Sequence, residues 1–198
     1  MYPERLVQQI QFIKEIDKLK YILRKTKLIN SDRRENDAEH SWHLAMMTIV
    51  LAEHSNHPID VLKVLKMVLI HDIVEIDAGD TFLFDTKKSH ENTSEERLAA
   101  NRIFGILPDD QAQELVAIWE EFEAGETHEA KFARTMDRLE PLLQNASNQG
   151  GTWREFDIDY AKVYARSCAM AQGSEVIWAY AQALLNNSVE KGILKKID

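Results

Sequence analysis

The sequence is poor in the residues that mark secreted, fibrous and disordered proteins. It has one cysteine, Cys168, so no disulfide can form within the chain, and a reducing compartment, the cytoplasm, is predicted. Seven glycines and four prolines among 198 residues are too few for a collagen-like or disordered chain. A chain of this length buries roughly 70% of its unfolded surface without covalent staples. We therefore expect one packed domain over residues 1–198.

An excess of positive charge and long apolar runs are also missing. The formal net charge is −9, which argues against a nucleic-acid-binding surface, because phosphate neutralisation needs clustered Lys and Arg. The longest apolar stretch, Met67–Ile70, is far shorter than the ~20 residues that span a bilayer. Residues 1–5 lack the apolar run of a signal peptide. Nucleic acid and membrane are thus not expected as partners.

Apolar residues recur at spacings of three and four through most of the chain, a pattern that predicts helices. The first apolar stripe covers residues 3–26, and a polar loop is expected to follow it. A second helix is predicted to open after Asp37, whose carboxylate can cap free backbone amides, and to end near Ser55. A third is predicted to start at Pro58 and to include the apolar run that ends at Ile70.

The second half of the chain continues the helical pattern. Thr93 begins a capping-box sequence, and Pro141 is expected to kink the helix that contains it. Trp153 follows a glycine turn and is expected in the core. No alternating strand of convincing length is found, so the fold class is predicted as all-α, a single-domain helical bundle. The later helices are expected over about residues 93–104, 108–124, 127–146, 158–172 and 174–189.

An adjacent histidine and aspartate, His71 and Asp72, end the apolar third helix. Burying both costs several kcal/mol unless each has a strong partner, and a divalent cation is one such partner. The remaining ligands must come from other helices, and His40 and Asp137 are the candidates. Two nitrogens and two oxygens leave positions open for water or phosphate on a six-coordinate ion. A metal held in this way suits phosphoester hydrolysis.

These positions resemble, in order and approximate spacing, the H…HD…D signature of the HD-domain metal-dependent phosphohydrolases. The resemblance extends from the first helix to about Asp159 and is strongest to the 5′-deoxynucleotidase-like branch. It implies one divalent ion (Mn²⁺, Co²⁺, Fe²⁺, Ni²⁺, Zn²⁺ or Mg²⁺) held by His40, His71, Asp72 and Asp137. The segments that carry it are Ala38-Glu39-His40-Ser41, His71-Asp72-Ile73-Val74-Glu75 with Gly79-Asp80, and Asp137-Arg138-Leu139.

The resemblance also implies roles for three further residues. Glu75 would position or deprotonate the attacking water, the alternative being a solvated carboxylate at a helix end. Asp80 would contact the sugar or order the site, the alternative being an ordinary turn residue. Arg24 would orient the substrate phosphate through its planar fork, the alternative being a surface arginine on an amphipathic helix. Where the deoxynucleotidases carry tryptophan after this arginine, the chain has Lys25.

Other histidines bear on the number of metal ions. His43 could pair with His40 on one helical face, but an outer hydrogen-bonding group or a substrate contact is preferred for it. Two-metal HD phosphodiesterases insert further histidines before the last aspartate. His90 and His128 do not fit that pattern, so one metal is favoured. Ile76 stands where the guanosine polyphosphate hydrolases carry an acidic residue, which disfavours that branch.

The expected activity is hydrolysis of nucleoside 5′-monophosphates, deoxynucleotides among them, to nucleoside and phosphate. Family analogy, together with the aromatic and methionine content of the last helices, also implies a homodimer. One alternative is an HD-type hydrolase of a triphosphate or a cyclic nucleotide. The other is a non-catalytic regulatory domain, in which the metal clamps the helices of a dimer.

Overall fold

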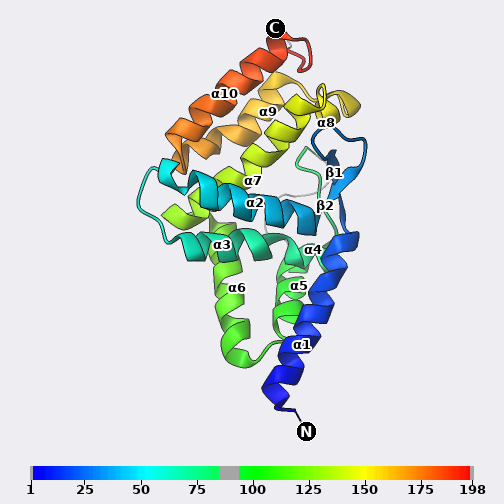
Figure 1. Cartoon of the computed structure of the whole chain (residues 1–198), viewed down its shortest axis with the longest axis vertical. Coiled ribbons are helices and arrows are strands. Elements are labelled where there is room, and N and C mark those ends of the chain that lie inside the picture. Colours follow the sequence, from blue (N-terminus) through cyan, green and yellow to red (C-terminus); the bar gives the residue numbers. More distant parts are fainter. Residues whose placement is uncertain (1, 85–93, 197–198) are drawn as a thin grey trace.

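The computed structural model describes residues 2–84 and 94–196, and helices dominate this part of the chain, as the all-α prediction requires (Figure 1). Short 3₁₀ turns extend several of them: η1 (Asp17–Tyr21), η2 (Ala52–His54), η3 (His71–Val74) and η4 (Cys168–Gln172). The helices are α1 (Glu4–Ile16), α2 (Asp37–Leu51), α3 (Val61–Ile70), α4 (Glu75–Ala78), α5 (Ser94–Phe104), α6 (Asp109–Ala124), α7 (His128–Ser147), α8 (Gly151–Glu155), α9 (Tyr160–Ser167) and α10 (Glu175–Glu190).

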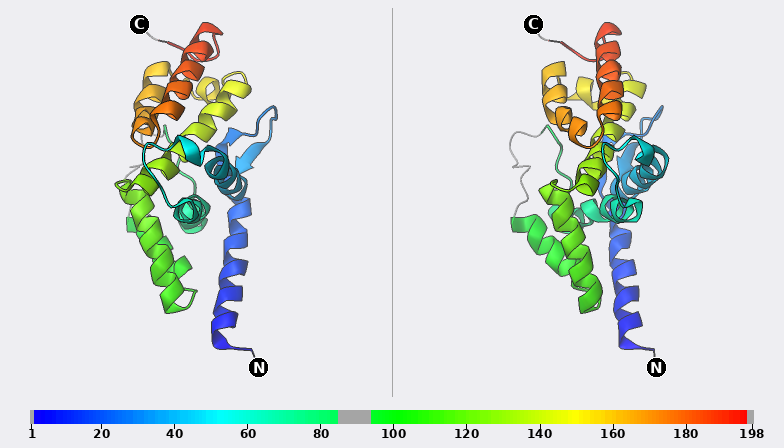
Figure 2. Two further views of the ribbon diagram at one scale, coloured as in Figure 1. Left: turned by 60° about the vertical axis from the view of Figure 1, so that its left-hand side comes forward. Right: turned by 90° about the vertical axis from the view of Figure 1, so that its left-hand side faces the viewer.

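Helix α7 is the central element of the bundle. It contacts α2, α3, α6, α8 and α10, while α1, α5 and α6 extend toward one end of the molecule and α8 to α10 form the other (Figures 1 and 2). Its apolar face is fully buried at Phe132 and Met136. Trp153 on α8 is also buried, which confirms its predicted place in the core. None of the described helices combines the length and the apolar character that crossing a bilayer requires.

A two-stranded antiparallel hairpin replaces the end of the predicted first helix. Strand β1 (Leu23–Lys27) pairs with β2 (Arg34–Asn36), and Leu23 lies opposite Asn36. Helix α1 ends at Ile16, so the prediction of a helix to residue 26 and of a chain without strands is wrong here. The strand was missed because it is short and polar, and its leucine continues the helical spacing. The consequence is that Arg24 lies on a strand.

Helix α2 begins one residue earlier than predicted. Its N-cap is Asn36, whose side chain accepts a hydrogen bond from Glu39 N at 3.0 Å, while the Glu39 carboxylate accepts one from Asn36 N at 3.2 Å. This reciprocal capping box satisfies two backbone donors that the helix leaves unpaired. Asp37, the predicted cap, is therefore free to face the interior, where it is completely buried. The capping-box residue Thr93 lies outside the described residues.

Pro141 lies inside α7, as predicted, and the helix continues through it to Ser147. Because proline has no N–H, it cannot donate to the carbonyl of Asp137, one turn earlier. The Asn145 side chain donates to the Pro141 carbonyl at 2.8 Å. The helix that carries Asp137 thus runs past the proline without ending.

Candidate functional site

The four predicted metal ligands converge from three separate elements. His40 lies in the first turn of α2, Asp137 in the middle of α7, and His71 and Asp72 in the η3 turn that ends α3. His40 Nε2 is 3.2 Å from Asp137 Oδ1 and 4.0 Å from Asp72 Oδ2. His71 Nε2 is 3.1 Å from Asp72 Oδ1 and 3.8 Å from Asp137 Oδ1. Ligand atoms of His40, His71 and Asp72 lie within 4.8 Å of one another, close enough to share one ion.

The protonation of His71 fits a metal ligand. Its Nδ1 lies 3.0 Å from the Val68 carbonyl oxygen, which can only accept, so Nδ1 carries the hydrogen. In the neutral ring, the form that binds a metal, the lone pair is then on Nε2, which is buried and makes no hydrogen bond with the described residues. This lone pair faces the carboxylates of Asp72 and Asp137. A buried acceptor pointing at two anions needs a cation between them, and imidazole with carboxylate is a suitable donor set.

A second layer of carboxylates orients His40. Its ring is completely buried, and Nδ1 lies 3.5 Å from Glu35 Oε2 and 3.4 Å from Glu140 Oε2. Gln144 Nε2 joins the two acids by donating to Glu35 Oε1 at 2.8 Å and to Glu140 Oε1. Such carboxylate contacts to the outer ring nitrogen direct the inner nitrogen toward a metal. His43 Nδ1 lies 3.2 Å from Glu140 Oε1, the place expected of an outer hydrogen-bonding group.

The charges at the centre show how strongly it demands a cation. Burial lowers the pKa of His40, but contacts with Asp137, Glu140 and Glu35 outweigh burial and hold this pKa well above its ordinary value. Burial raises the pKa of Asp137, but the hydrogen bond with His40 and the nearby His71 ring bring it well below its ordinary value. Protons held on histidine, and not on Asp137, thus offset the carboxylate charge in the metal-free protein. A divalent cation would replace those protons, because bound histidine must be neutral.

The remaining predicted site residues form an acidic group beside this centre. Ligand atoms of Asp37, Glu75 and Asp80 also lie within 4.8 Å of one another. Burial, followed by repulsion from Asp72 and Asp37, raises the pKa of Glu75 well above its ordinary value. Burial likewise raises the pKa of Asp80. Glu75 is therefore not the solvated helix-end carboxylate of the alternative interpretation.

Arg24 reaches the same place from strand β1. Its Nη1 donates to Asp72 Oδ2 at 3.0 Å and lies 3.7 Å from Asp37 Oδ1, while Nε is 3.6 Å from Glu35 Oε2. Its side chain is only 14% exposed. Burial lowers the pKa of Arg24, but Asp72 and Asp137 raise it above the ordinary value. The alternative of a surface arginine on an amphipathic helix is wrong, because alternation along the strand turns this side chain inward.

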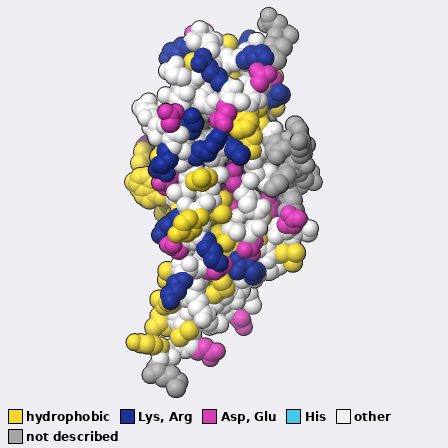
Figure 3. Space-filling view, turned by 90° about the vertical axis from the view of Figure 1, so that its right-hand side faces the viewer, with side chains coloured by type: hydrophobic (Ala, Val, Ile, Leu, Met, Phe, Trp, Pro, Cys, Tyr) yellow, Lys and Arg dark blue, Asp and Glu magenta, His cyan; other side chains and the backbone are white. Residues whose placement is uncertain are grey.

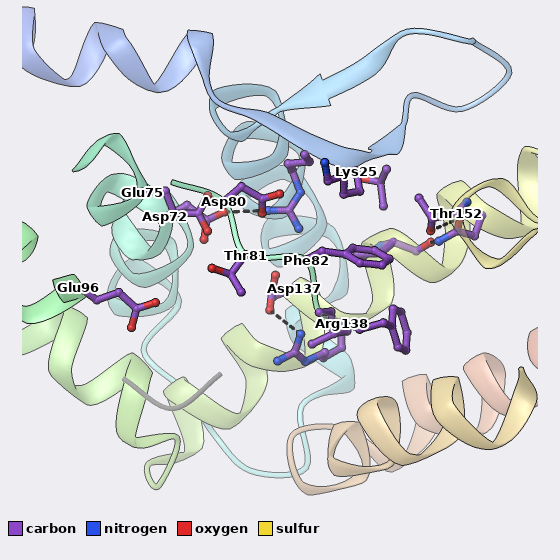
Figure 4. A pocket seen from close by; sticks show the side chains of 16 residues that line it. Lys25, Asp72, Glu75, Asp80, Thr81, Phe82, Glu96, Asp137, Arg138 and Thr152 are labelled. Carbon is purple, nitrogen blue, oxygen red and sulfur yellow. Dashed lines mark hydrogen bonds and ion pairs between the residues drawn. The ribbon is translucent and has the colours of Figure 1, made fainter. Parts of the chain in front are cut away.

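A cavity of about 180 Å³ opens beside the centre (Figure 4). Asp72, Glu75 and Asp80 lie together on one side of it, and Arg138 lies beyond Asp137 on another. Lys25 also lines the cavity. The remaining lining includes the aromatic side chains of Phe82 and Phe84, along with Pro141, Asn145 and Thr152. The cavity thus presents anions, cations and apolar rings to one bound molecule.

Sequence reasoning missed Glu35, Asp37 and Glu140 as parts of the site. Glu140 follows Asp137 by three residues on a helix, so both side chains share one face, and this spacing was the available signal. Glu35 falls in the polar loop expected after residue 26, since the hairpin was not predicted. The other histidines lie elsewhere: His128 stacks on His57 with ring centroids 4.0 Å apart, and His90 lies outside the described residues.

Replacing Glu140 by glutamine is expected to weaken metal binding by roughly 10- to 100-fold. The glutamine keeps the shape of the side chain but places an amide against the Gln144 amide or the His40 ring, so a buried donor loses its acceptor. Competition with a coloured chelator measures the affinity. Glu114→Gln, at an exposed surface ion pair with Lys66, is the control. Wild-type affinity in Glu140→Gln would show that His40 does not need the Glu140 carboxylate behind it.

Asp37 is expected to make the metal-free protein less stable as the pH rises. Burial, then repulsion from Asp72, raises the pKa of Asp37 from 3.8 to about 7. Between these values the folded chain binds more protons than the unfolded chain. The free energy of unfolding that Asp37 contributes is therefore fully present below the lower pKa and is lost as the pH rises through about 7. The loss due to Asp37 is on the order of 2–4 kcal/mol.

Urea unfolding of chelator-treated protein at several pH values measures this dependence. Asp37→Asn is expected to flatten it, because the amide does not titrate. The exposed Asp157 offers the matched control, since Asp157→Asn removes a carboxylate without changing the buried group. An equally steep pH dependence in Asp37→Asn and wild type would contradict the prediction.

Comparison with known proteins places this geometry in a family. A family model described as an HD domain matches residues 16–178. A solved structure of a predicted metal-dependent phosphohydrolase from Magnetospirillum magnetotacticum MS-1 is 50% identical, with a TM-score of 0.93 over 98% of this chain and 99% of that one. The 5′-deoxynucleotidase HDDC2 of Bos taurus is 29% identical over 154 residues, 74% of this chain and 73% of that protein. Its counterpart in Dictyostelium discoideum is 30% identical over 142 residues, 68% of this chain and 74% of that protein.

The matched region contains every predicted site residue, from Arg24 to Asp137. It therefore includes the buried histidines and aspartates that converge from α2, η3 and α7, and the acidic group beside them. The family match spans most of the chain, and the solved relative has the same fold over nearly its whole length. The chain belongs to the HD-domain family of metal-dependent phosphohydrolases.

Proposed function

We propose that the protein hydrolyses nucleoside 5′-monophosphates, deoxynucleotides among them, to nucleoside and phosphate. The observation that carries the proposal is the convergence of His40, His71, Asp72 and Asp137 at a cavity that also holds Glu75. The similarity to 5′-deoxynucleotidases at about 29% identity supports the choice of substrate. The mixed charged and aromatic lining of the cavity suits a molecule with a phosphate group and a base.

His40, His71, Asp72 and Asp137 would hold the ion. A divalent cation bound there supplies the positive charge that polarises a phosphoryl oxygen and acidifies water. Glu75 takes the proton from the attacking water: its Oε2 is buried and has no hydrogen-bond partner among the described residues, and its raised pKa makes it a stronger base.

Arg24 and Asp80 bind and orient the substrate in this proposal. The guanidinium of Arg24 offers parallel N–H donors to two oxygens of the substrate phosphate, and its contact with Asp72 holds it at the cavity wall. Asp80 lies on the same wall and would accept a hydrogen bond from a sugar hydroxyl. Lys25 adds a second positive charge to the cavity wall, at the position where the resemblance implies tryptophan in the deoxynucleotidases, so base preference is expected to differ from theirs.

A nucleotide panel tests the activity directly. The purified protein is incubated with Mn²⁺ or Co²⁺ and with ribonucleoside and deoxyribonucleoside 5′-monophosphates, triphosphates and cyclic monophosphates, and the products are separated. We expect inorganic phosphate and nucleoside from the monophosphates, and none after addition of a chelator. Release of pyrophosphate or tripolyphosphate would favour the triphosphate alternative, and ring opening the cyclic one. No product from any substrate would refute the proposal.

One ion per chain is expected in this proposal. The acidic group of Asp37, Glu75 and Asp80 is the specific feature that favours a second ion, since its oxygen donors suit Mg²⁺ or Mn²⁺. Elemental analysis of the wild-type protein and of Asp80→Asn after gel filtration distinguishes a one-ion site from a two-ion site. Two ions in wild type and one in the variant would replace the single-ion proposal.

The non-catalytic alternative makes a different prediction about metal removal. If the ion only held helices together, its removal would lower the melting temperature steeply, and the protein would have no phosphohydrolase activity with or without it. A catalytic ion chiefly costs activity. The buried Glu75 favours the catalytic proposal, because a clamp would not need a buried carboxylate whose Oε2 has no hydrogen-bond partner among the described residues.

A homodimer is part of the proposal. Helix α2 exposes a row of large apolar side chains, with Trp42, Met46, Ile49 and Val50 between 42% and 64% exposed. Tyr180 on α10 is also exposed, whereas Trp178 packs in the core. A contiguous apolar face of this kind is typical of a subunit contact. Light scattering is expected to give twice the chain mass, and Ile49→Lys to shift it toward a monomer.

A further inference from the structure

A second cavity, of about 360 Å³, lies behind the candidate active site. It is bounded by the turn between α6 and α7, by α7 itself, and by α9 with η4; Figure 2 shows α9 above the point where α6 meets α7. Four basic side chains line it, and no carboxylate does so among the described residues. The four basic residues are Lys131, Arg134, Arg138 and Arg166, and the cavity that they line is called the basic cavity below.

The gathering of these cations runs against the composition of the protein. The chain carries 33 acidic and 24 basic residues, so a wall of four cations without an acid among the described lining residues is not what the composition favours. Lys131, Arg134 and Arg138 follow one another at spacings of three and four on α7, which places them on one helical face. Arg166 comes from the neighbouring helix α9. Two helices thus turn like charges toward one space.

The basic side chains keep donors free for a ligand. Arg134 is fixed by hydrogen bonds from Nη1 to the Glu123 and Phe122 carbonyls, at 2.8 and 3.4 Å, and its guanidinium carbon lies 6.0 Å from the Phe122 ring centroid. Its Nε and Nη2 make no hydrogen bond with the described residues. Lys131 and Arg166 form no ion pair within the described part of the chain.

Arg138 connects the basic cavity to the candidate active site. It lines both cavities, and its Nη1 lies 3.7 Å from Asp137 Oδ2, beyond hydrogen-bond distance (Figure 4). A ligand on the far side of this guanidinium would therefore be one side chain away from a predicted metal ligand. Arginine forks and a lysine ammonium match the oxygens of phosphate, and a dianion would relieve the repulsion among the four cations.

We propose that the basic cavity binds a phosphate group, either free inorganic phosphate or the phosphate of a small ester, at a site separate from the one where hydrolysis takes place. The binding depends on Lys131, Arg134, Arg138 and Arg166 and does not rest on the proposed substrate. Because Arg138 is shared, an occupied cavity changes the charge felt at Asp137 and so modulates the candidate active site. Phosphate released by hydrolysis is one source of such a ligand.

Equilibrium dialysis of the metal-loaded full chain with radiolabelled inorganic phosphate tests the proposal. Lys131→Gln/Arg166→Gln is expected to weaken one class of phosphate binding at least tenfold, whereas Arg24→Gln leaves that class unchanged. Lys14→Gln/Lys162→Gln removes the same charge from exposed positions and is the matched control. Circular dichroism melting checks that each variant is folded; Arg134, which also holds backbone carbonyls, is left intact for this reason.

The proposal is overturned if Lys131→Gln/Arg166→Gln binds phosphate as wild type does, or if the surface control loses as much binding. Failure of the nucleotidase proposal would leave the dialysis result standing, because the dialysis detects binding without turnover. Competition by a nucleoside 5′-phosphonate, which has no ester bond to hydrolyse, separates the two ligand sources. Displacement of the label from the basic cavity assigns it to phosphate esters, and no displacement assigns it to free phosphate.

Discussion

Glu75→Gln is expected to lower the rate of phosphate release by about 100-fold or more while leaving the metal content unchanged. Glutamine has nearly the same shape but cannot take a proton from water, and a positioned base contributes roughly 10²–10⁴-fold to such reactions. The predicted ion ligands are all other residues, so metal binding does not need the Glu75 carboxylate. Turnover is measured with the best nucleotide of the panel, and bound metal by elemental analysis of the same sample.

Asp77→Asn is the control for Glu75→Gln. Asp77 lies on the same short helix but is exposed and paired with Arg102, with Asp77 Oδ1 2.8 Å from Arg102 Nη2. Its variant should keep wild-type turnover. Near wild-type turnover in Glu75→Gln would remove Glu75 from the proposed mechanism and point to another base, with the completely buried Asp37 of the same acidic group as the candidate.

Asp137→Asn is expected to abolish metal retention and with it all measurable phosphate release. The carboxylate oxygen that faces both His40 Nε2 and His71 Nε2 would lose its charge, and the amide would bring N–H donors toward the ring nitrogens. We expect the affinity to fall by more than the roughly 10–100-fold seen when an outer partner is removed. Dialysed protein is analysed for bound Mn²⁺ or Co²⁺ and assayed on the nucleotide panel.

Asp157→Asn serves as the control, since Asp157 is exposed and pairs with Lys195, with Asp157 Oδ1 3.1 Å from Lys195 Nζ. A melting curve shows whether Asp137→Asn is folded. Folded Asp137→Asn that retains a full complement of metal would contradict the four-ligand site. Comparing the metal affinities of Asp137→Asn and Glu140→Gln also tests the order of the two residues. The predicted ligand Asp137 should affect the affinity more than Glu140, which contacts the metal only through His40.

The helical fold and the convergence of the four predicted ligands could be anticipated from the sequence. His71 and Asp72 stand out because polar residues at the end of an apolar helix need a partner, and Asp137 stands out on an apolar face for the same reason. Their roles came from the family resemblance. Distances between helices are set by packing over the whole bundle, so the approach of His40 to Asp137 within 3.2 Å could not be calculated from spacing.

The outer residues were missed for a different physical reason. Glu35, Asp37 and Glu140 are completely or almost completely buried, yet in the sequence they look like the charged residues of a solvated loop or helix face. Charged residues are rarely buried without partners, so exposure was the natural expectation. The hairpin explains why Glu35 is buried and Arg24 is mostly buried, because each lies at an inward-facing position of its strand. Its few residues carry too little pattern to be distinguished from the end of a helix.

The hairpin also decides which insertions and deletions the protein can tolerate. A two-stranded ribbon is marginally stable alone, and here Asn148 at the end of α7 ties down the connecting loop by donating to the carbonyls of Lys27 and Leu28. An extra residue at the tip, near Asp32, would extend into solvent and leave the strand pairing unchanged. Deleting one residue inside β1 would shift the strand pairing by one position and turn Arg24 to the outside, which would remove the proposed phosphate contact while leaving the four predicted metal ligands in place.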